Sequence, residues 1–233
     1  PMSRRPFVFI NMAMTADGKI ATANQAVSSF GSSQDFEHLL ELRATADAVM
    51  TGAGTLKAQP DITLGPGPAR FRRMRKGHGL ADAPVRIIVS GSGKIDPKAK
   101  LLSSKDGPII ILTTKRMPKI RQQTLTQSGG NVHVCGKTKV DLAAALNWLY
   151  TEWRVKRLLC EGGGQLNGSL LAARLVDEIH LTICPKIFGG HNASTIADGA
   201  LAERLIDARQ FKLSSMQPKG EEIFLVYQAQ STS

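Results

Sequence analysis

The chain has 233 residues and a mass of 25.1 kDa, enough for one large domain or two small ones. Hydrophobic residues make up 42% and charged residues 21%, which excludes a wholly disordered chain, and no apolar run reaches the roughly 18 residues of a membrane-spanning helix. We therefore expect a single domain over residues 1–233, a cytoplasmic location and no membrane contact.

The net charge points to an anionic partner. Thirty Lys and Arg residues against 19 Asp and Glu residues give a formal charge of +11, which favours a nucleic acid, an acidic lipid or a phosphorylated small molecule. Aromatic residues are only 5%, few for a stacking surface that binds single strands, so we favour the phosphorylated ligand. The cysteines have no C-x-x-C spacing, and we expect Cys135, Cys160 and Cys184 to be buried thiols in a reducing compartment, with no metal site.

In the first third of the chain, apolar runs alternate with amphipathic stretches, as in an α/β fold. We expect a strand over residues 7–14 followed by a turn at Asp17-Gly18. A helix capped by Ser32 or Ser33 and a strand over residues 48–51 come next.

Residues 57–84 are rich in proline and glycine and predict a long loop, of the kind that is functional or mobile. It contains the basic run 70–76, for which we weigh a phosphate grip or a nucleic-acid patch against a solvated surface. The solvated surface is the favoured interpretation.

The rest of the chain predicts parallel strands joined by helices, and then an antiparallel hairpin. The expected strands cover residues 85–89, 109–113, 132–135, 158–160 and 178–184, with a helix over 141–150 and a final hairpin near 210–213 and 223–227. A sheet of this kind binds ligands at the carboxyl ends of its strands.

The strongest local motif is a glycine-rich turn between the strand ending at Cys160 and a helix that follows Gly164. Free backbone N–H groups and the helix dipole at such a turn suit a phosphate. The spacing does not match G-x-G-x-x-G and no P-loop lysine follows, so a standard nucleotide site is not supported. A tight packing turn explains the glycines equally well.

Polar residues at other strand ends are weaker candidates. Asp17 and Lys19 follow the first strand close to Asn11 and Thr15, but Asp17 can serve only to bond turn amides. Glu161 lies at the end of its strand and can accept hydrogen bonds from an NH-rich substrate, although a lone glutamate is more often solvated. A second strand-to-helix turn is Gly52-Ala53-Gly54-Thr55.

Taken together, these motifs resemble the riboflavin-biosynthesis pyrimidine reductases, a family similar in fold to dihydrofolate reductase. The resemblance extends in order over almost the whole chain. It is carried by the motifs at residues 14–21, 42–44, 51–55, 84–90, 161–164, 175–178 and 184–190.

The resemblance implies a three-layer α/β/α fold with a central, mostly parallel sheet and a C-terminal antiparallel hairpin. It implies NADPH-dependent reduction of the ribosyl group of a phosphoribosylamino-pyrimidine to a ribityl group, with hydride transfer to C1′ of the ring-opened imine. Because the chain has no zinc deaminase signature, it is similar to a stand-alone reductase, which favours the diamino substrate over the deaminated one. It also implies a homodimer, which would protect the edge of the late hairpin.

The resemblance also implies which residues form the site. The expected cofactor-binding residues are Met14, Thr55, Gln59, Ser90, Gly91, Gly163, Gly164, Gln165, Leu166, Asn167, Gly168 and Ser169. The expected substrate-binding residues are Ser28, Arg43, Ile62 and Glu161, with Arg43 aimed at the phosphate. No catalytic residue is assigned, and the candidates are Asp17, Lys19 and Glu161.

Two departures from the family pattern leave other substrates open. The stretch ending at Gln59-Pro60 lacks the acid that the family places before the proline, and the loop over residues 65–79 is longer and more basic. A reductase of the same fold acting on a pterin or another imine or carbonyl compound is therefore an alternative. A nonenzymatic nucleic-acid-binding protein is the least favoured hypothesis.

Overall fold

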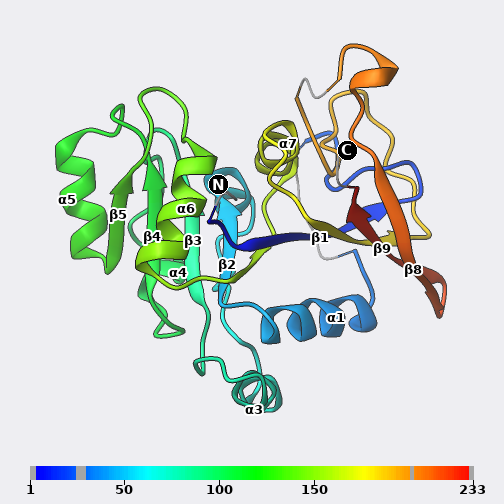
Figure 1. The fold of residues 1–233 in the computed structure, drawn as a ribbon, viewed down its shortest axis with the longest axis horizontal. Helices are drawn as coiled ribbons and strands as arrows, with labels where there is room; N and C mark the ends of the chain where they lie inside the picture. Colours follow the sequence, from blue (N-terminus) through cyan, green and yellow to red (C-terminus); the bar gives the residue numbers. More distant parts are fainter. Residues whose placement is uncertain (1–3, 25–29, 200–201, 231–233) are drawn as a thin grey trace. The chain divides into compact units, whose positions relative to one another are not determined.

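The computed structural model describes residues 4–24, 30–199 and 202–230 (Figure 1). Its strands are β1 (Phe7–Thr15), β2 (Ala48–Gly52), β3 (Val85–Val89), β4 (Ile109–Thr113), β5 (Gly130–Val134), β6 (Arg157–Cys160), β7 (Glu178–Cys184), β8 (Phe211–Lys219) and β9 (Glu222–Ala229). Its helices are α1 (Ser33–Ala44), α2 (Ala53–Ala58), α3 (Ala69–Gly77), α4 (Lys100–Ser103), α5 (Lys119–Gln127), α6 (Leu142–Glu152) and α7 (Gly164–Ala172), with a 3-10 turn at Leu205–Asp207.

The chain divides into two compact units. Unit 1 comprises residues 1–7 and 40–159, and unit 2 comprises residues 8–39 and 160–233. Helix α1 begins in unit 2 and ends in unit 1. The expectation of a single domain over the whole chain stays a prediction.

Unit 1 is built on a parallel sheet with the strand order β5-β4-β3-β2-β6. Its central strands are runs of buried Ile, Val and Leu, as expected for strands covered on both faces. On the edge strand β5, Val132 lies beside α5, whereas the next residue, His133, stacks on Trp148 of α6 with ring centroids 3.7 Å apart. Because successive side chains point to opposite faces, α5 and α6 cover the two faces of the sheet, and the predicted α/β/α layering is confirmed.

Unit 2 contains the strand order β1-β7-β9-β8. Strands β1 and β7 are parallel, with Met12 opposite Leu181, whereas β9 is antiparallel to both β7 and β8. The predicted C-terminal hairpin is therefore confirmed. Its strands are longer than expected, because polar residues continue the β8 ladder to Lys219.

The long loop predicted over residues 57–84 is wrong in its middle, where α3 forms. Pro68 has the fixed φ of −56° at the N-cap position, and Phe71 packs in a buried cluster with Leu40 and Ala44 of α1. The basic run is also not a uniformly solvated surface, because Arg75 is only 1% exposed. Charged side chains therefore cover one side of α3 while Phe71 and Arg75 point inward.

The prediction of buried thiols is confirmed: Cys135, Cys160 and Cys184 are free and buried. Burial raises the pKa of Cys135 to about 11 and that of Cys160 to about 12. The pKa of Cys184 is raised to about 12 by burial and by the nearby Glu222 carboxylate. All three are protonated thiols at neutral pH. No helix in the part of the chain that the structure describes has the length and apolar character needed to cross a bilayer.

Candidate functional site

In unit 2, the turn after β1 is fixed by Asp17. Its carboxylate accepts hydrogen bonds from the Thr15 hydroxyl and from the backbone N–H groups of Phe188, at 3.2 Å, and Gly189, at 2.7 Å. These bonds lower the pKa of Asp17 below its ordinary value. The carboxylate therefore holds the turn against the loop after β7, as an ionised acceptor and not as a proton donor.

Lys19 belongs to the same turn. Its backbone pairs with Thr195, and its Nζ lies 3.4 Å from the carbonyl oxygen of Ala193. The structure thus joins the turn after β1 to the loop over residues 186–195. Met14 lies on the last part of β1, opposite Ile183 of β7.

The glycine-rich turn after β6 leads directly into α7, and its glycines are packed by another loop. A Cβ at Gly164 would lie 2.4 Å from both the Thr195 carbonyl oxygen and the Asp198 carboxylate, and a Cβ at Gly168 would lie 2.0 Å from the Asp198 carbonyl oxygen. The backbone N–H of Asp198 donates to the carbonyl of Gly164 at 2.9 Å. Close packing therefore accounts for these two glycines, whatever else the turn binds.

Two side chains of α7 point into the fold. Asn167 is fully buried, and its Nδ2 donates to the carbonyl of Ile196 at 2.9 Å, while Leu166 is also buried. Glu161 follows Cys160, the last residue of β6, at the carboxyl end of the strand.

In unit 1, four expected cofactor residues lie at one edge of the sheet. Strands β2 and β3 are parallel, with Gly52 opposite Val89, so the turns that follow them emerge side by side. Thr55 lies in the first turn of α2, and Gln59 follows that helix, its N–H bonded to the Thr55 carbonyl at 2.8 Å. The structure therefore brings these two residues to the same edge as Ser90 and Gly91, which follow β3 directly.

Backbone at this edge of unit 1 is open to a ligand. A Cβ at Gly54 would have no heavy atom within 4 Å, and one at Gly91 would have none nearer than 3.7 Å. The Thr114 hydroxyl, after β4, donates to the Gly91 carbonyl at 2.6 Å and fixes the turn. Glycines with free space beside them allow a cofactor to approach the protein backbone closely, which fits the expected nicotinamide cofactor.

The expected substrate residues of unit 1 lie near the end of α1. Arg43 is in the last turn of α1, and its Nη1 donates to the Gly65 carbonyl at 3.0 Å. Ile62 closes the turn after α2, with its N–H bonded to the Gln59 carbonyl at 3.2 Å. Ser28 lies outside the described residues. Sequence reasoning missed Arg75, whose Nη1 donates to the Arg43 carbonyl at 2.6 Å.

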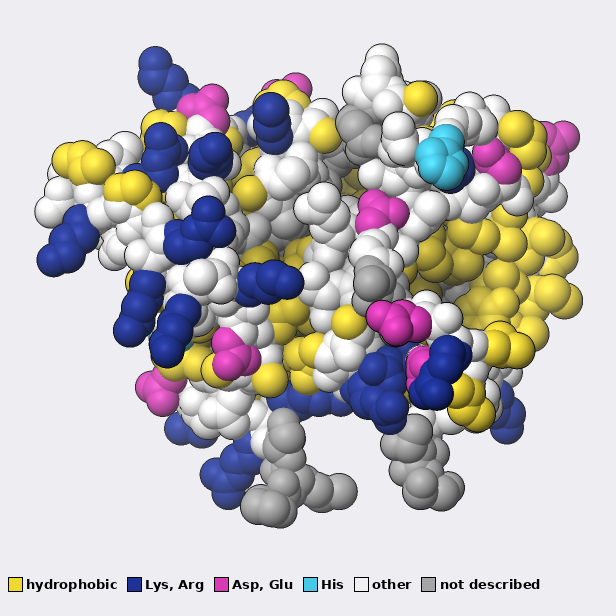
Figure 2. All heavy atoms as spheres, turned by 90° about the horizontal axis from the view of Figure 1, so that it is seen from above, with side chains coloured by type: hydrophobic (Ala, Val, Ile, Leu, Met, Phe, Trp, Pro, Cys, Tyr) yellow, Lys and Arg dark blue, Asp and Glu magenta, His cyan; other side chains and the backbone are white. Residues whose placement is uncertain are grey.

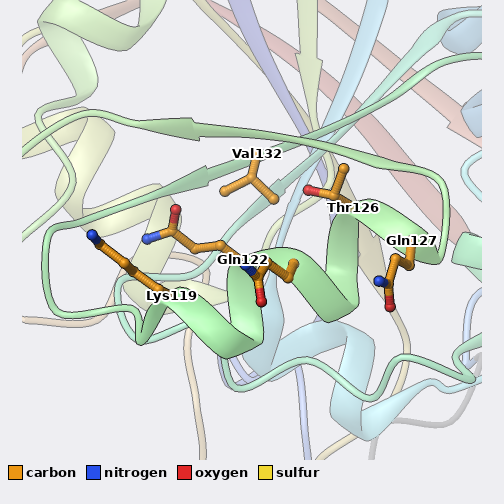
Figure 3. A pocket seen from close by; sticks show the side chains of 6 residues that line it. Lys119, Gln122, Thr126, Gln127 and Val132 are labelled. Atoms are coloured by element: carbon orange, nitrogen blue, oxygen red, sulfur yellow. The ribbon is translucent and has the colours of Figure 1, made fainter.

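A hollow on the surface of α5 lies apart from these residues. Figure 3 shows the side chains of α5 that line it and Val132 on the neighbouring strand β5. Its lining consists of Lys119, Gln122, Gln123, Thr126, Gln127 and Val132. None of the expected site residues lines it. Within residues 4–24, 30–199 and 202–230, His, Cys, Asp and Glu side chains form no cluster of three or more that could hold a metal ion.

Comparisons with known proteins identify the family. The chain is similar to the 2,5-diamino-6-ribosylamino-4(3H)-pyrimidinone 5′-phosphate reductase of Methanothermobacter thermautotrophicus, with 34% identity over 96% of this chain and 98% of that protein. Its fold is similar to that of Acinetobacter baumannii RibD, with a TM-score of 0.80 and 21% identity over 98% of this chain and 59% of that chain. A pyrimidine reductase-like protein of Corynebacterium diphtheriae gives a TM-score of 0.79 and 24% identity over 100% of this chain and 96% of that chain.

The match to a family model extends over most of the sequence. The model of the RibD C-terminal domain matches residues 6–225, which include most of both units and all of the motifs that carried the resemblance. The expected family and fold are therefore confirmed, and the chain belongs to the family of RibD C-terminal domains.

Proposed function

We propose that the protein reduces the ribosyl group of 2,5-diamino-6-ribosylamino-4(3H)-pyrimidinone 5′-phosphate to a ribityl group, with NADPH as the reductant. The observation that carries this proposal is the 34% identity, over nearly the full length of both chains, to a reductase named for that substrate. The proposal places the enzyme in the cytoplasm, because its buried free thiols suit a reducing compartment.

In this proposal the cofactor supplies the hydride, and the residues of the chain bind the cofactor and the substrate and orient them for hydride transfer. In unit 1, the turns at Thr55 and at Ser90-Gly91 receive the cofactor. Arg43 binds the substrate phosphate, and the Glu161 carboxylate accepts hydrogen bonds from N–H groups of the pyrimidine. Holding the imine carbon near the hydride donor and excluding water then account for most of the catalytic effect.

The preference for NADPH over NADH is supported by cations near the Ser90-Gly91 turn. Lys115 and Arg116 follow β4 directly after Thr114, whose hydroxyl is bonded to Gly91. The 2′-phosphate is the group that distinguishes NADPH from NADH, and two exposed cations at this edge favour the phosphorylated cofactor.

The activity test is NADPH oxidation by the purified protein, with the diamino and the deaminated phosphoribosylamino-pyrimidines supplied in parallel and dihydrofolate as a third substrate. We expect turnover of the diamino compound. Turnover of only the deaminated compound would place the enzyme after deamination, and turnover of only dihydrofolate would support a pterin reductase. Binding of NADPH without any turnover would contradict the proposed substrate.

We also propose a homodimer that forms through one face of the unit 2 sheet. In register across β7, β9 and β8, this face carries Leu181, Leu225 and Met216, with Leu213 and Ile223 beside them. Met216 is 63% exposed, Leu213 47% and Ile223 39%. Figure 2 shows a broad hydrophobic hollow on the side that carries these strands. Leu181 and Leu225 are buried, so the exposed part of this face is formed by Met216, Leu213 and Ile223, and an exposed apolar patch of this kind marks an interface.

The dimer is tested by placing a charge on this face. Leu213→Glu is expected to shift the protein from dimer to monomer at micromolar concentration in light scattering, because a carboxylate would be buried unpaired in the interface. The matched control is Lys212→Glu, on the neighbouring exposed position of β8 that points to the opposite face. A monomeric wild-type protein would contradict the proposal, and so would a dimer that Leu213→Glu leaves intact.

A further inference from the structure

One arginine of the basic helix α3 is turned into unit 1. Arg75 is 1% exposed, although its neighbours Arg73 and Met74 are exposed. Its Nε donates to the Ala81 carbonyl at 2.8 Å, and its Nη1 donates to the carbonyls of Arg43 and Ala46 at 2.6 and 2.7 Å. A buried guanidinium whose Nε and Nη1 both donate to backbone carbonyls has a structural role, because these bonds compensate for its burial.

The positions of the hydrogen-bond acceptors indicate the structural role of Arg75. Helix α1 ends at Ala44, so the carbonyls of Arg43 and Ala46 belong to its last turn and to the residues just after it. Carbonyls at a helix C-terminus lack partners within the helix and carry the negative end of the helix dipole. The Arg75 cation binds the Arg43 carbonyl in this last turn and the Ala46 carbonyl just beyond it, and thereby fixes the end of α1.

The same segment also holds the side chain of Arg43. Its Nη1 donates to the carbonyl of Gly65, a few residues before α3. Phe71 of α3 packs on Leu40 and Ala44, the residues on either side of Arg43 in the last turns of α1. Both the backbone and the guanidinium of Arg43 are therefore held by residues 65–75, the segment in which the sequence departs from the family pattern.

We propose that Arg75 is a positioning residue that sets selectivity for the phosphorylated form of the substrate by orienting Arg43. The inference rests on the proposed function, in which Arg43 binds the 5′-phosphate. A guanidinium binds phosphate through a planar fork of N–H donors, so the contact depends on direction as well as distance. When the last turn of α1 tilts, the phosphate contact is lost first, while contacts to the pyrimidine and the cofactor remain.

The experiment compares kcat/KM for the diamino substrate with kcat/KM for its dephosphorylated form, at saturating NADPH. The variants are Arg43→Met, Arg75→Met and Arg75→Lys, and the matched control is Arg73→Met, which removes one exposed cation from the same helix. We expect the phosphate selectivity to fall about tenfold in both Arg75 variants and further in Arg43→Met, with KM for NADPH unchanged. Arg73→Met is expected to keep the wild-type selectivity.

Two readouts separate positioning from general damage. In a double-mutant cycle, Arg75→Lys is expected to cause no further loss of phosphate selectivity once Arg43 is Met, because both changes remove the same contact. If Arg75→Met does not fold, as judged by circular dichroism, Arg75→Lys decides, since it keeps the charge and loses the fork.

Three results would overturn the inference while leaving the proposed function in place. They are unchanged phosphate selectivity in the Arg75 variants, an equal loss of activity on both forms of the substrate, and unchanged selectivity in Arg43→Met. A wild-type protein that turns over neither form would instead remove the proposed function, and the inference with it.

Discussion

Two glycines of α7 show how a single hydrogen atom in place of a side chain shapes unit 2. Gly164 and Gly168 lie one helical turn apart, and the backbone of residues 195–198 runs directly over both of them. A Cβ at Gly168 would approach the Asp198 carbonyl oxygen to 2.0 Å, which leaves no room for any other residue. Two hydrogen bonds hold the loop against α7: the Asp198 N–H donates to the Gly164 carbonyl, and the Asn167 side chain donates to the Ile196 carbonyl.

We expect Gly168→Ala to lower the free energy of unfolding by about 1–3 kcal/mol, because the added methyl group must displace the Asp198 backbone. Urea unfolding followed by circular dichroism measures the change. The control is Gly77→Ala in α3, where a Cβ meets nothing within 4 Å and alanine is expected to be neutral or to stabilise by about 0.4–1 kcal/mol. Equal stability of Gly168→Ala and the wild type would contradict the packing described here.

The sequence could show that this turn needs glycine, but not for what purpose. A phosphate cradle and a packing turn both require the absence of Cβ atoms, so the run at residues 162–164 predicted the two equally. What distinguishes them is the loop at Thr195 and Asp198, about 30 residues away in the chain. Nothing in the local pattern of either segment indicates that they meet.

At the level of elements, the first half of α1 packs on β7 and β9 through polar and aromatic side chains. His38 lies against His180 of β7 and Phe224 of β9, with ring centroids 5.5 and 5.4 Å apart. Burial is the largest cause that lowers the pKa of His38 to about 4, with the charges of His180 and Lys219 adding to it. His38 is therefore neutral in the folded protein at neutral pH.

This shift predicts a loss of stability in mild acid. Between pH 6.5 and about 4 the unfolded chain binds more protons at His38 than the folded chain, so the free energy of unfolding falls as the pH falls through this window. His38→Gln is expected to remove at most about 2 kcal/mol of this pH dependence, less than the full pKa shift would give, because solvent screens a partly exposed side chain. Thermal or urea unfolding across the window measures it.

The pH dependence of stability must be compared between His38→Gln and the wild type, because Asp35 changes the free energy of unfolding with pH in the opposite direction. Burial and, to a smaller extent, Glu222 raise the pKa of Asp35, while the nearby Thr182 side chain partly offsets the shift. Its contribution is present at low pH and is lost as the pH rises through the folded pKa. If the free energy of unfolding of His38→Gln depends on pH as steeply as that of the wild type, His38 is not buried in its neutral form between α1 and the strands β7 and β9.

Helix α3 is the element that the sequence pattern failed to predict. Prolines and glycines on both sides of the basic run are the usual signals of a loop, and α3 has only Phe71 and Arg75 on its buried side. A buried arginine carries no apolar periodicity, so the pattern that reveals other helices is missing. The acceptors that make its burial possible come from α1 and cannot be seen in the local sequence.

At the level of the whole molecule, the positive charge is concentrated in one unit. Unit 1 has 23 Lys and Arg residues against 8 Asp and Glu residues, a formal charge of +15, whereas unit 2 has 7 against 11, a charge of −4; together they give the +11 of the chain. Figure 2 shows many Lys and Arg side chains gathered over one part of the face in view. The asymmetry favours anionic ligands at unit 1.

We expect the double variant Lys115→Ala with Arg116→Ala to lower the ratio of kcat/KM for NADPH to that for NADH about tenfold, since charged hydrogen bonds to the 2′-phosphate would be lost. The control is Lys105→Ala with Lys156→Ala, which removes two exposed cations of unit 1 that precede strands instead of following them. An equal change of the ratio in both double variants would indicate a general effect of charge and contradict a specific 2′-phosphate contact.

Most of the architecture was predictable because most strands of the parallel sheet are buried apolar runs with their own turn signals, whereas in the edge strand β5 only Gly130 is buried. β3 and β4 occupy the predicted residues 85–89 and 109–113, and the late hairpin was predicted near 210–213 and 223–227, within the longer strands β8 and β9. The division of the chain into two units was not visible, because each unit is assembled from separate stretches of the chain and no linker separates them.

The most direct test of the reductase is to follow the hydride. Incubation with NADPH that carries deuterium at the transferred position, followed by mass spectrometry and NMR of the product, is expected to show one deuterium atom at C1′ of a ribityl chain on the diamino pyrimidine. Deuterium at any other carbon, or an unlabelled product, would contradict reduction of the ribosyl group as the activity of this protein.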